Sequence, residues 1–305
     1  MNAVTIKNQY PIPFISKLIT QLCGAKYFSK LDVCWGFNNV WICDGDEWKA
    51  TFHTNNGLFE PQVMFFSLTN SPATFQTMMG DIFRDMIVEG VVCVYLDGIL
   101  IFTKMLSEHW NIMWRVLECL WEHKLYLKLE KCKFEWRQIE YLGVIVSDGL
   151  VEMDPVKVSG VVEWPVPWNM KEVQSFVGFV NFYQRFINFS HHACTLFDLT
   201  KKDVGWKWEE SEQAAFNKPK GLITSTPVLI FPDDSCPYCI EANSSNAAVL
   251  SQQTSSENGG KWHPIAFFSK SLSPVKQNYK IHDKEMLAII HALEEWWHYL
   301  EGTPC

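Results

Sequence analysis

Two aspartates, Asp32 and Asp97, stand in sequence settings that could bring their carboxylates together. Residues 24–52 alternate apolar and polar side chains between Gly and Asp breaks, which is typical of short strands, and Asp32 falls at the end of one. Asp97 lies in Tyr95-Leu96-Asp97-Gly98, where Asp-Gly between two β-rich runs predicts a hairpin turn. Adjacent carboxylates can hold two Mg²⁺ ions about 4 Å apart, which clamp the attacking and leaving oxygens in phosphoryl transfer. The pair therefore predicts nucleotidyl transfer, although either aspartate alone is an ordinary turn residue.

The segments around these aspartates have the periodicity of a helix-and-strand scaffold. Residues 75–87 repeat apolar side chains every three or four positions up to Gly90, which predicts an amphipathic helix. Two strand-like runs follow at 91–96 and 99–102, with Asp97-Gly98 as their turn. A second amphipathic helix is expected around 112–120, and a strand at 141–146.

The second half of the chain changes character. Three prolines punctuate residues 151–170, and a helix with an apolar stripe is expected from about residue 171. Residues 227–242 and 264–269 are typical of strands, and residues 283–300 of a helix. No G-x-G-x-x-G turn occurs, which argues against a dinucleotide-binding α/β enzyme.

Composition predicts a globular protein of about two domains, because 305 residues at 48% hydrophobic suffice for sizeable cores. No run of about 20 apolar residues and no secretory leader occurs, so we expect no membrane contact and an intracellular location, in the cytoplasm, the nucleus or both. Cys236-Pro-Tyr-Cys239 has the spacing of a zinc or redox pair but lacks a second pair, so we expect reduced thiols. The net charge of −8 argues against a nucleic-acid binder.

Five ordered sequence blocks nevertheless resemble the reverse transcriptases of gypsy-type LTR retrotransposons over nearly all of the chain. The blocks are residues 8–13 (NQYPIP), 28–32 (FSKLD), 70–76 (NSPATFQ), 94–97 (VYLD) and 140–143 (EYLG). The resemblance implies an α+β fold, with a right-hand polymerase of palm, fingers and thumb followed by a partial RNase H-like α/β domain. It implies domains at 1–150 (partial fingers and palm), 151–215 (thumb and connection) and 216–305 (RNase H-like).

By this resemblance Asp32 and Asp97 are the catalytic, metal-binding carboxylates, and the cofactor is Mg²⁺, with Mn²⁺ as a substitute. Phe37 would block a ribose 2′-hydroxyl; read without the family, it is a core aromatic residue. The nucleotide and template pocket would be shaped by Ser71, Pro72 and Gln76.

The resemblance also assigns residues outside the palm. The primer end would be held by Tyr141, Leu142 and Gly143, which otherwise read as part of a strand. In the RNase H-like part, Asn243 and Glu285 take the places of the first two carboxylates. The partners implied are an RNA template, a DNA primer and a deoxynucleoside triphosphate, with the oligomeric state left open.

Two of these positions depart from the family pattern. Gly98 replaces the second aspartate of the hairpin motif, which removes one negative charge beside the metals and predicts weakened polymerase activity. Asn243 replaces a carboxylate with an amide that carries no charge for Mg²⁺, so the RNase H part is expected to be inactive. We also expect a fragment, with one fingers strand missing at the start and the RNase H-like part truncated at its C-terminus.

The basic residues are unusual in kind, because only four of the 26 are arginine, against 14 tryptophans. Several tryptophans and cysteines, among them Trp110, Trp114 and Trp121, occupy places where similar elements often carry arginine. One C-to-T transition converts an arginine codon into either residue, so we hypothesise that decay of a silenced repeat produced this sequence. The function predicted is a retrotransposon-derived RNA-directed DNA polymerase fragment with impaired activity; the alternative is a non-catalytic remnant that binds RNA–DNA duplex.

Overall fold

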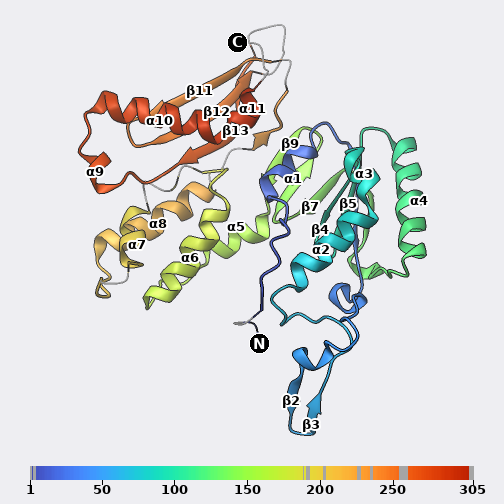
Figure 1. Ribbon diagram of the computed structural model, residues 1–305. Coiled ribbons are helices and arrows are strands. Elements are labelled where there is room, and N and C mark those ends of the chain that lie inside the picture. The colour runs from blue at the N-terminus through green and yellow to red at the C-terminus, as the bar shows by residue number, and fades with distance from the viewer. Residues whose placement is uncertain are drawn as a thin grey trace. The chain divides into compact units, whose positions relative to one another are not determined.

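The chain has an α+β fold that divides into two compact units, Met1–Ile139 and Glu140–Cys305 (Figure 1). The computed structural model describes residues 2, 5–187, 189, 193–201, 204–224, 228–233, 236–253 and 260–301. The three-part division at residues 150 and 215 remains a prediction. Among the helices of these described residues, none is both long and apolar enough to cross a bilayer.

The first unit is built on an antiparallel sheet with the strand order β4-β5-β1-β6. The strands are β1 (Tyr27–Asp32), β4 (Val92–Tyr95), β5 (Gly98–Thr103) and β6 (Lys133–Trp136). β5 pairs with both β1 and β4, so it brings the end of β1 beside the β4–β5 turn.

Helices cover one face of this sheet. They are α2 (Ser71–Ile82), α3 (Arg84–Val88) and α4 (Leu106–Glu122), and α1 (Ile15–Gln21) precedes the sheet. Fully buried side chains form one core cluster; they include Phe75 and Val116 from the helices, Phe83 from the junction of α2 and α3, and Leu31 and Ile99 from the strands. Burying each large side chain stabilises the fold by about 1.5–3 kcal/mol, so this cluster fixes the helices against the strands that carry Asp32 and Asp97.

The helix expected at 75–87 begins earlier and is broken. Ser71 and Pro72 form its first turn, since proline suits the start of a helix, and Phe83 separates α2 from α3. Gly90 ends α3 with φ +72°, as the sequence predicts. The helix expected at 112–120 is confirmed within α4.

A buried polar network ties α4 to the sheet. His109 is fully buried, with its Nε2 2.7 Å from Ser29 Oγ and its Nδ1 3.0 Å from Thr103 Oγ1. Ser29 Oγ accepts from the Glu135 backbone N–H, and Thr103 Oγ1 donates to the Met105 carbonyl. Thr103 therefore accepts from Nδ1–H and Ser29 donates to Nε2, a pattern that only the neutral imidazole completes.

The free energy of unfolding of the protein is expected to fall as the pH drops below about 6.5, the ordinary pKa of histidine. Burial lowers the pKa of His109, partly offset by the Glu135 carboxylate, so the unfolded chain binds the proton more readily. The stabilisation is complete above the unfolded pKa and is lost on acidification. Urea unfolding at pH 7.5 and 5.5 should show a smaller pH dependence for His109→Gln than for the unmodified chain, whereas His53→Gln, at an exposed site, should retain it. An equal effect of both substitutions would contradict the assignment.

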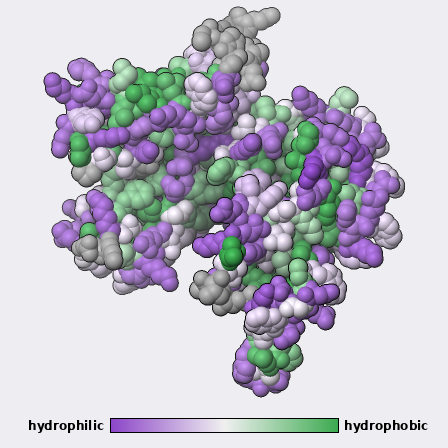
Figure 2. Space-filling view, in the orientation of Figure 1, coloured by the Kyte–Doolittle hydropathy of each residue, from purple (hydrophilic) through white to green (hydrophobic). Residues whose placement is uncertain are grey.

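A small hairpin, β2 (Phe52–Thr54) and β3 (Gly57–Phe59), projects from the first unit. Phe52, Leu58 and Phe59 on it are exposed, and they give a hydrophobic patch at the lower end of Figure 2. Phe52 and Phe59 stack with their ring centroids 6.0 Å apart, so the hairpin carries its own apolar contact.

The boundary between the two units falls inside β7, the edge strand of a sheet of order β10-β9-β8-β7 whose other strands belong to the second unit. Its strands are β7 (Gln138–Tyr141), β8 (Val144–Ser147), β9 (Leu150–Met153) and β10 (Leu229–Ile230). The single strand expected at 141–146 is therefore wrong. Leu142 and Gly143 have φ +48° and +82°, which makes them a tight turn between β7 and β8.

Four helices follow, α5 (Pro155–Val162), α6 (Met170–Phe182), α7 (Cys194–Leu199) and α8 (Glu210–Thr224). The start of α6 is set by side-chain caps: the N-cap residue Asn169 accepts from the Glu172 N–H through Oδ1, and the Glu172 carboxylate accepts from the N–H of the preceding residue, Trp168. The helix expected from residue 171 is thus confirmed.

A three-stranded antiparallel sheet completes the second unit, with β11 (Tyr238–Asn243), β12 (Ala247–Gln253) and β13 (Trp262–Ser269). The helices α9 (Pro274–Gln277), α10 (Ile281–Glu295) and α11 (Trp297–Leu300) follow it. The strand expected at 227–242 is two short strands, β10 and β11, and Pro227 lies outside the described residues. The long helix expected at 283–300 is interrupted at Trp296.

Candidate active site

Asp32 and Asp97 lie at the same end of the β1–β5 strand pair. Asp32, the last residue of β1, lies directly opposite Gly98, and the Val33 N–H donates to the Asp97 carbonyl at 2.9 Å. The Asp32 side chain is 19% exposed, and Asp97 is exposed at the turn. The structure therefore places two aspartates that are far apart in sequence next to each other along the backbone.

The turn that carries Asp97 differs from the one expected. Tyr95 pairs with Gly98, so the two central residues are Leu96 and Asp97, and Gly98 is already the first residue of β5. Leu96, not Gly98, takes the left-handed conformation, with φ +53°. A leucine there costs about 1–2 kcal/mol, so neighbouring groups must hold it.

Gln76 on α2 provides that support. Its amide nitrogen donates to the Val94 carbonyl at 3.1 Å, and its oxygen accepts from the Leu96 N–H at 2.8 Å. Gln76 is 4% exposed; the bond to Val94 is buried and the bond from Leu96 is partly buried, and leaving a buried polar group unpaired costs about 1–3 kcal/mol. Gln76 thus fixes the position of the Asp97 turn from a neighbouring helix.

The other residues assigned to the nucleotide pocket lie close by. Ser71 is fully buried at the start of α2, where its hydroxyl donates to the Phe65 carbonyl, and Pro72 follows it. Phe37 is partly buried, and its ring packs edge-on against that of Phe75 with the ring centroids 5.6 Å apart. These contacts agree with a core role for Phe37; a role against the ribose remains a prediction.

Gly36 permits the close approach of these groups. A Cβ atom at this position would lie 3.2 Å from the Phe75 ring and 3.4 Å from Asp97 Cβ. Any larger residue would push the Phe75 ring or the Asp97 turn outward. The glycine thus keeps the segment after β1 against the hairpin.

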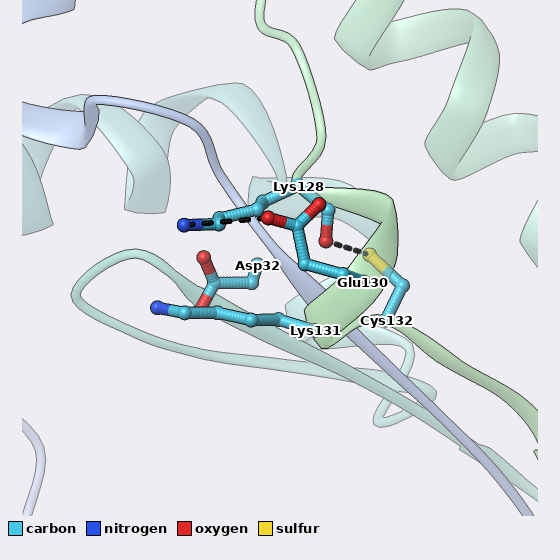
Figure 3. Close-up of polar contacts among 5 residues, drawn as sticks. All are labelled: Asp32, Lys128, Glu130, Lys131 and Cys132. Atoms are coloured by element: carbon cyan, nitrogen blue, oxygen red, sulfur yellow. Dashed lines mark hydrogen bonds and ion pairs between the residues drawn. The ribbon is translucent and has the colours of Figure 1, made fainter.

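Lys131 is the site residue that sequence reasoning missed. Its Nζ lies 3.2 Å from Asp32 Oδ2, and Figure 3 shows its side chain reaching the carboxylate while Lys128 turns toward Glu130, 3.5 Å away. The Lys128 backbone N–H also donates to the Asp32 carbonyl at 2.9 Å, which places the 3-10 turn Leu129–Lys131 beside β1. No sequence pattern singles out this lysine, because the contact joins segments 99 residues apart.

The donor set fits a hard divalent cation that keeps much of its water. The described residues contain no group of three or more acidic, histidine or cysteine side chains that could enclose a metal. Two neighbouring carboxylates suit Mg²⁺ or Mn²⁺, since Mg²⁺ is usually bound by one or two carboxylates together with water and substrate phosphates. Asp32 and Asp97 would hold such an ion.

Of the residues assigned to the primer end, Tyr141 is the buried last residue of β7, and Leu142 and Gly143 form the β7–β8 turn. The Tyr183 hydroxyl on the C-terminal side of α6 donates to the Gly143 carbonyl at 3.1 Å. Burial, with the nearby Asp154 and Glu140 carboxylates adding to it, raises the pKa of Tyr183 to about 12. Tyr183 therefore stays a neutral donor and ties this turn to the helix.

The RNase H-like positions lie on elements that touch, β11 and α10. Asn243 ends β11, and its Oδ1 accepts from the Ser245 N–H at 3.0 Å, as in an Asx turn. Glu285 is exposed on α10. The Asn243 side chain has a structural task in the turn and brings no charge to this site.

Comparisons with known proteins agree with this architecture. The family described as "Reverse transcriptase (RNA-dependent DNA polymerase)" matches residues 1–146, and the "RNase H-like domain found in reverse transcriptase" matches residues 208–305. The chain is 36% identical over 319 residues to the "Retrovirus-related Pol polyprotein from transposon opus" of Drosophila melanogaster, and 34% over 304 residues to the "Transposon Tf2-3 polyprotein" of Schizosaccharomyces pombe. The matches cover 99% of this chain but only 31% and 23% of those polyproteins.

Solved structures show the same fold. A foamy viral protease-reverse transcriptase in complex with RNA/DNA hybrid aligns with a TM-score of 0.82 at 22% identity, over 99% of this chain and 41% of that one. A second foamy viral structure, in complex with ds DNA, aligns with a TM-score of 0.85, also at 22% identity, over 99% of this chain and 53% of that one. The two family matches and the transposon relatives thus agree with the five sequence blocks, and the chain belongs to the retrotransposon Pol polyprotein family, as a reverse transcriptase region joined to an RNase H-like region.

Proposed function

We propose that this chain is the polymerase region of a retrotransposon enzyme that extends a DNA primer on an RNA template, with weakened activity. The observation that carries the proposal is the placement of Asp32 and Asp97 at one end of the β1–β5 pair. A divalent ion held there would neutralise the phosphates of an incoming deoxynucleoside triphosphate and polarise the reacting phosphorus. The weakness follows from Gly98, which supplies no carboxylate opposite Asp32.

The chain's own residues would position the reaction rather than perform covalent chemistry. Asp32 and Asp97 supply the negative charge that holds the ion, and Gln76 and Gly36 keep the hairpin against β1. Lys131 is a cation close enough to meet a phosphate as well as Asp32. The relatives act within longer polyproteins, so the parent enzyme's full activity is part of this proposal.

We further propose that the RNase H-like region is inactive, because the Asn243 amide takes the place of a carboxylate and is engaged with Ser245. The expected result is no cleavage of the RNA strand of an RNA–DNA hybrid with Mg²⁺ or Mn²⁺. Cleavage by the unmodified chain that Glu285→Gln abolishes would refute this part.

The test is extension of a labelled DNA primer on an RNA template with Mg²⁺ or Mn²⁺, using the unmodified chain and Asp32→Asn. We expect slow extension that Asp32→Asn abolishes. Equal extension by both proteins would refute the assignment of Asp32. Tight binding of the RNA–DNA duplex with no extension by the unmodified chain would favour the alternative, a duplex-binding remnant without chemistry.

Removing the Lys131 charge should tighten metal binding by up to about fivefold, the equivalent of about 1 kcal/mol for a partly exposed ion pair. Lys131 is 54% exposed and competes with the ion for Asp32. Mn²⁺ binding to Lys131→Met, followed by electron paramagnetic resonance, measures the effect without requiring activity. Lys128→Met is the matched control, because Lys128 pairs with Glu130, and an equal change in both variants would contradict the competition.

A further inference from the structure

A short turn, residues 33–36, joins Asp32 to Phe37, the side chain expected to block a ribose 2′-hydroxyl. Trp35 in this turn has a left-handed backbone, with φ +51° and ψ +38°. A residue with a Cβ atom is strained in that conformation, so neighbouring groups must hold it. The position of Phe37 relative to Asp32 therefore depends on the contacts that fix this turn.

The side chain of Asn39 supplies such contacts. Its Nδ2 donates to the Cys34 carbonyl at 3.0 Å and to the carbonyls of Trp35 and Gly36 at 3.3 Å. An amide nitrogen has two hydrogens to donate, and here three consecutive carbonyls share them. One side chain thus closes the turn that precedes Phe37.

Packing fixes Phe37 on one side only. Its ring contacts those of Phe75 and Phe66, with the centroids 5.6 and 5.1 Å apart, but Phe66 is 83% exposed. Asn39 also lines a cavity of about 520 Å³, together with Thr77 and other side chains of α2. A cavity supplies no partner atoms on its open side. The hydrogen bonds of Asn39 therefore provide the support that packing against Phe75 alone does not.

We infer that Asn39 is a positioning residue: by closing the turn it keeps the Phe37 ring in place, and so determines how strongly the enzyme rejects ribonucleoside triphosphates. This inference rests on the proposed polymerase function. The two classes of nucleotide differ by one hydroxyl, and a ring can exclude that hydroxyl only if the ring does not move aside. Asn39 acts through Phe37 and supplies no ligand to the ion.

The experiment is primer extension by the full chain with Mn²⁺, comparing kcat/KM for a deoxynucleoside triphosphate with that for the matching ribonucleoside triphosphate. Asn39→Asp has nearly the same shape, but its carboxylate cannot donate and repels the three carbonyls. We expect the preference for the deoxynucleotide to fall about tenfold, because small displacements of a positioning group have effects of this size or larger. The change should lie chiefly in a lower KM for the ribonucleotide.

Two further variants separate the hydrogen bonds from other effects. Asn38→Asp is the matched control, because Asn38 is exposed and the substitution adds the same charge one residue away. It should leave the nucleotide preference unchanged. Asn39→Gln keeps the amide, and the adjoining cavity leaves room for its extra methylene, so the preference should stay within about threefold of that of the unmodified chain.

Three results would overturn the inference. They are an unchanged preference in Asn39→Asp, an equal loss of preference in Asn39→Asp and Asn38→Asp, and an equal loss of extension with both nucleotides, which indicates a general loss of stability.

Hydrogen exchange of residues 33–40 gives a readout that needs no activity. Exchange should be faster in Asn39→Asp than in the unmodified chain and unchanged in Asn38→Asp. If none of the proteins extended the primer, the proposed polymerase function would be refuted by that result alone. Equal exchange rates in the two variants would overturn the role of Asn39.

Discussion

Gly98→Asp is expected to tighten Mn²⁺ binding at least about tenfold, the equivalent of about 1.4 kcal/mol, and to raise primer extension by a similar factor. Gly98 lies directly opposite Asp32, and cross-strand partners have Cβ atoms about 5 Å apart. The new carboxylate would therefore lie beside that of Asp32. The backbone accepts it, because Gly98 does not have a left-handed φ and its Cβ would meet only the Tyr95 carbonyl, at 3.4 Å.

The same substitution is expected to destabilise the metal-free protein by about 0.5–1 kcal/mol, because like charges directly opposite each other on a sheet repel. With Mn²⁺ added, Gly98→Asp should instead be more stable than the unmodified chain, since the ion binds the folded state. Gly98→Asn is the matched control: it has the same shape without the charge. Equal Mn²⁺ affinity for the Asp and Asn variants would show that the site at Asp32 does not use this position, and extension by neither would place the defect elsewhere in the chain.

The sequence was sufficient to predict the helices and strands of the palm-like sheet, the β4-β5-β1-β6 sheet of the first unit, but it predicted the turns less well. Periodicity placed α4 and the two strands around Asp97, because an amphipathic pattern depends only on neighbours along the chain. The turn was misplaced by one residue. Asp-Gly is a strong local signal, but Gln76, distant in sequence, holds Leu96 in the left-handed conformation and makes Leu96-Asp97 the turn instead.

The candidate site divides in the same way. Asp32 and Asp97 were identified through the family blocks, and the structure brings them together. Lys131 was not identified, because its contact with Asp32 depends on the 3-10 turn Leu129–Lys131 folding back beside β1. The paired roles of Gln76 also require tertiary contacts. Metal-binding residues that belong to a motif can thus be identified from sequence. Residues that position them, such as Gln76, or pair with them, such as Lys131, cannot.

The helical part of the second unit shows where a single substitution should have the largest effect on stability. Phe176 on α6 is fully buried and lies at the meeting point of three segments. Its ring centroid lies 4.5 Å from that of Phe216 on α8 and 5.8 Å from that of Trp164, which follows α5. Removing the ring would leave a cavity that α5, α6 and α8 cannot all close around at once.

Phe176→Ala is therefore expected to lower the free energy of unfolding of the second unit by about 3–5 kcal/mol. Most domains have only about 5–15 kcal/mol to lose, so these helices should unfold locally at ordinary temperature. Hydrogen exchange read by mass spectrometry should show lost protection in α5, α6 and α8, with β1, β4 and β5 of the first unit unchanged. Trp168→Ala, an exposed aromatic residue just before α6, should change exchange little. If protection fell equally in the palm-like sheet, the two compact units would unfold as one, and the stability of the Asp32 site would depend on the helical core as well.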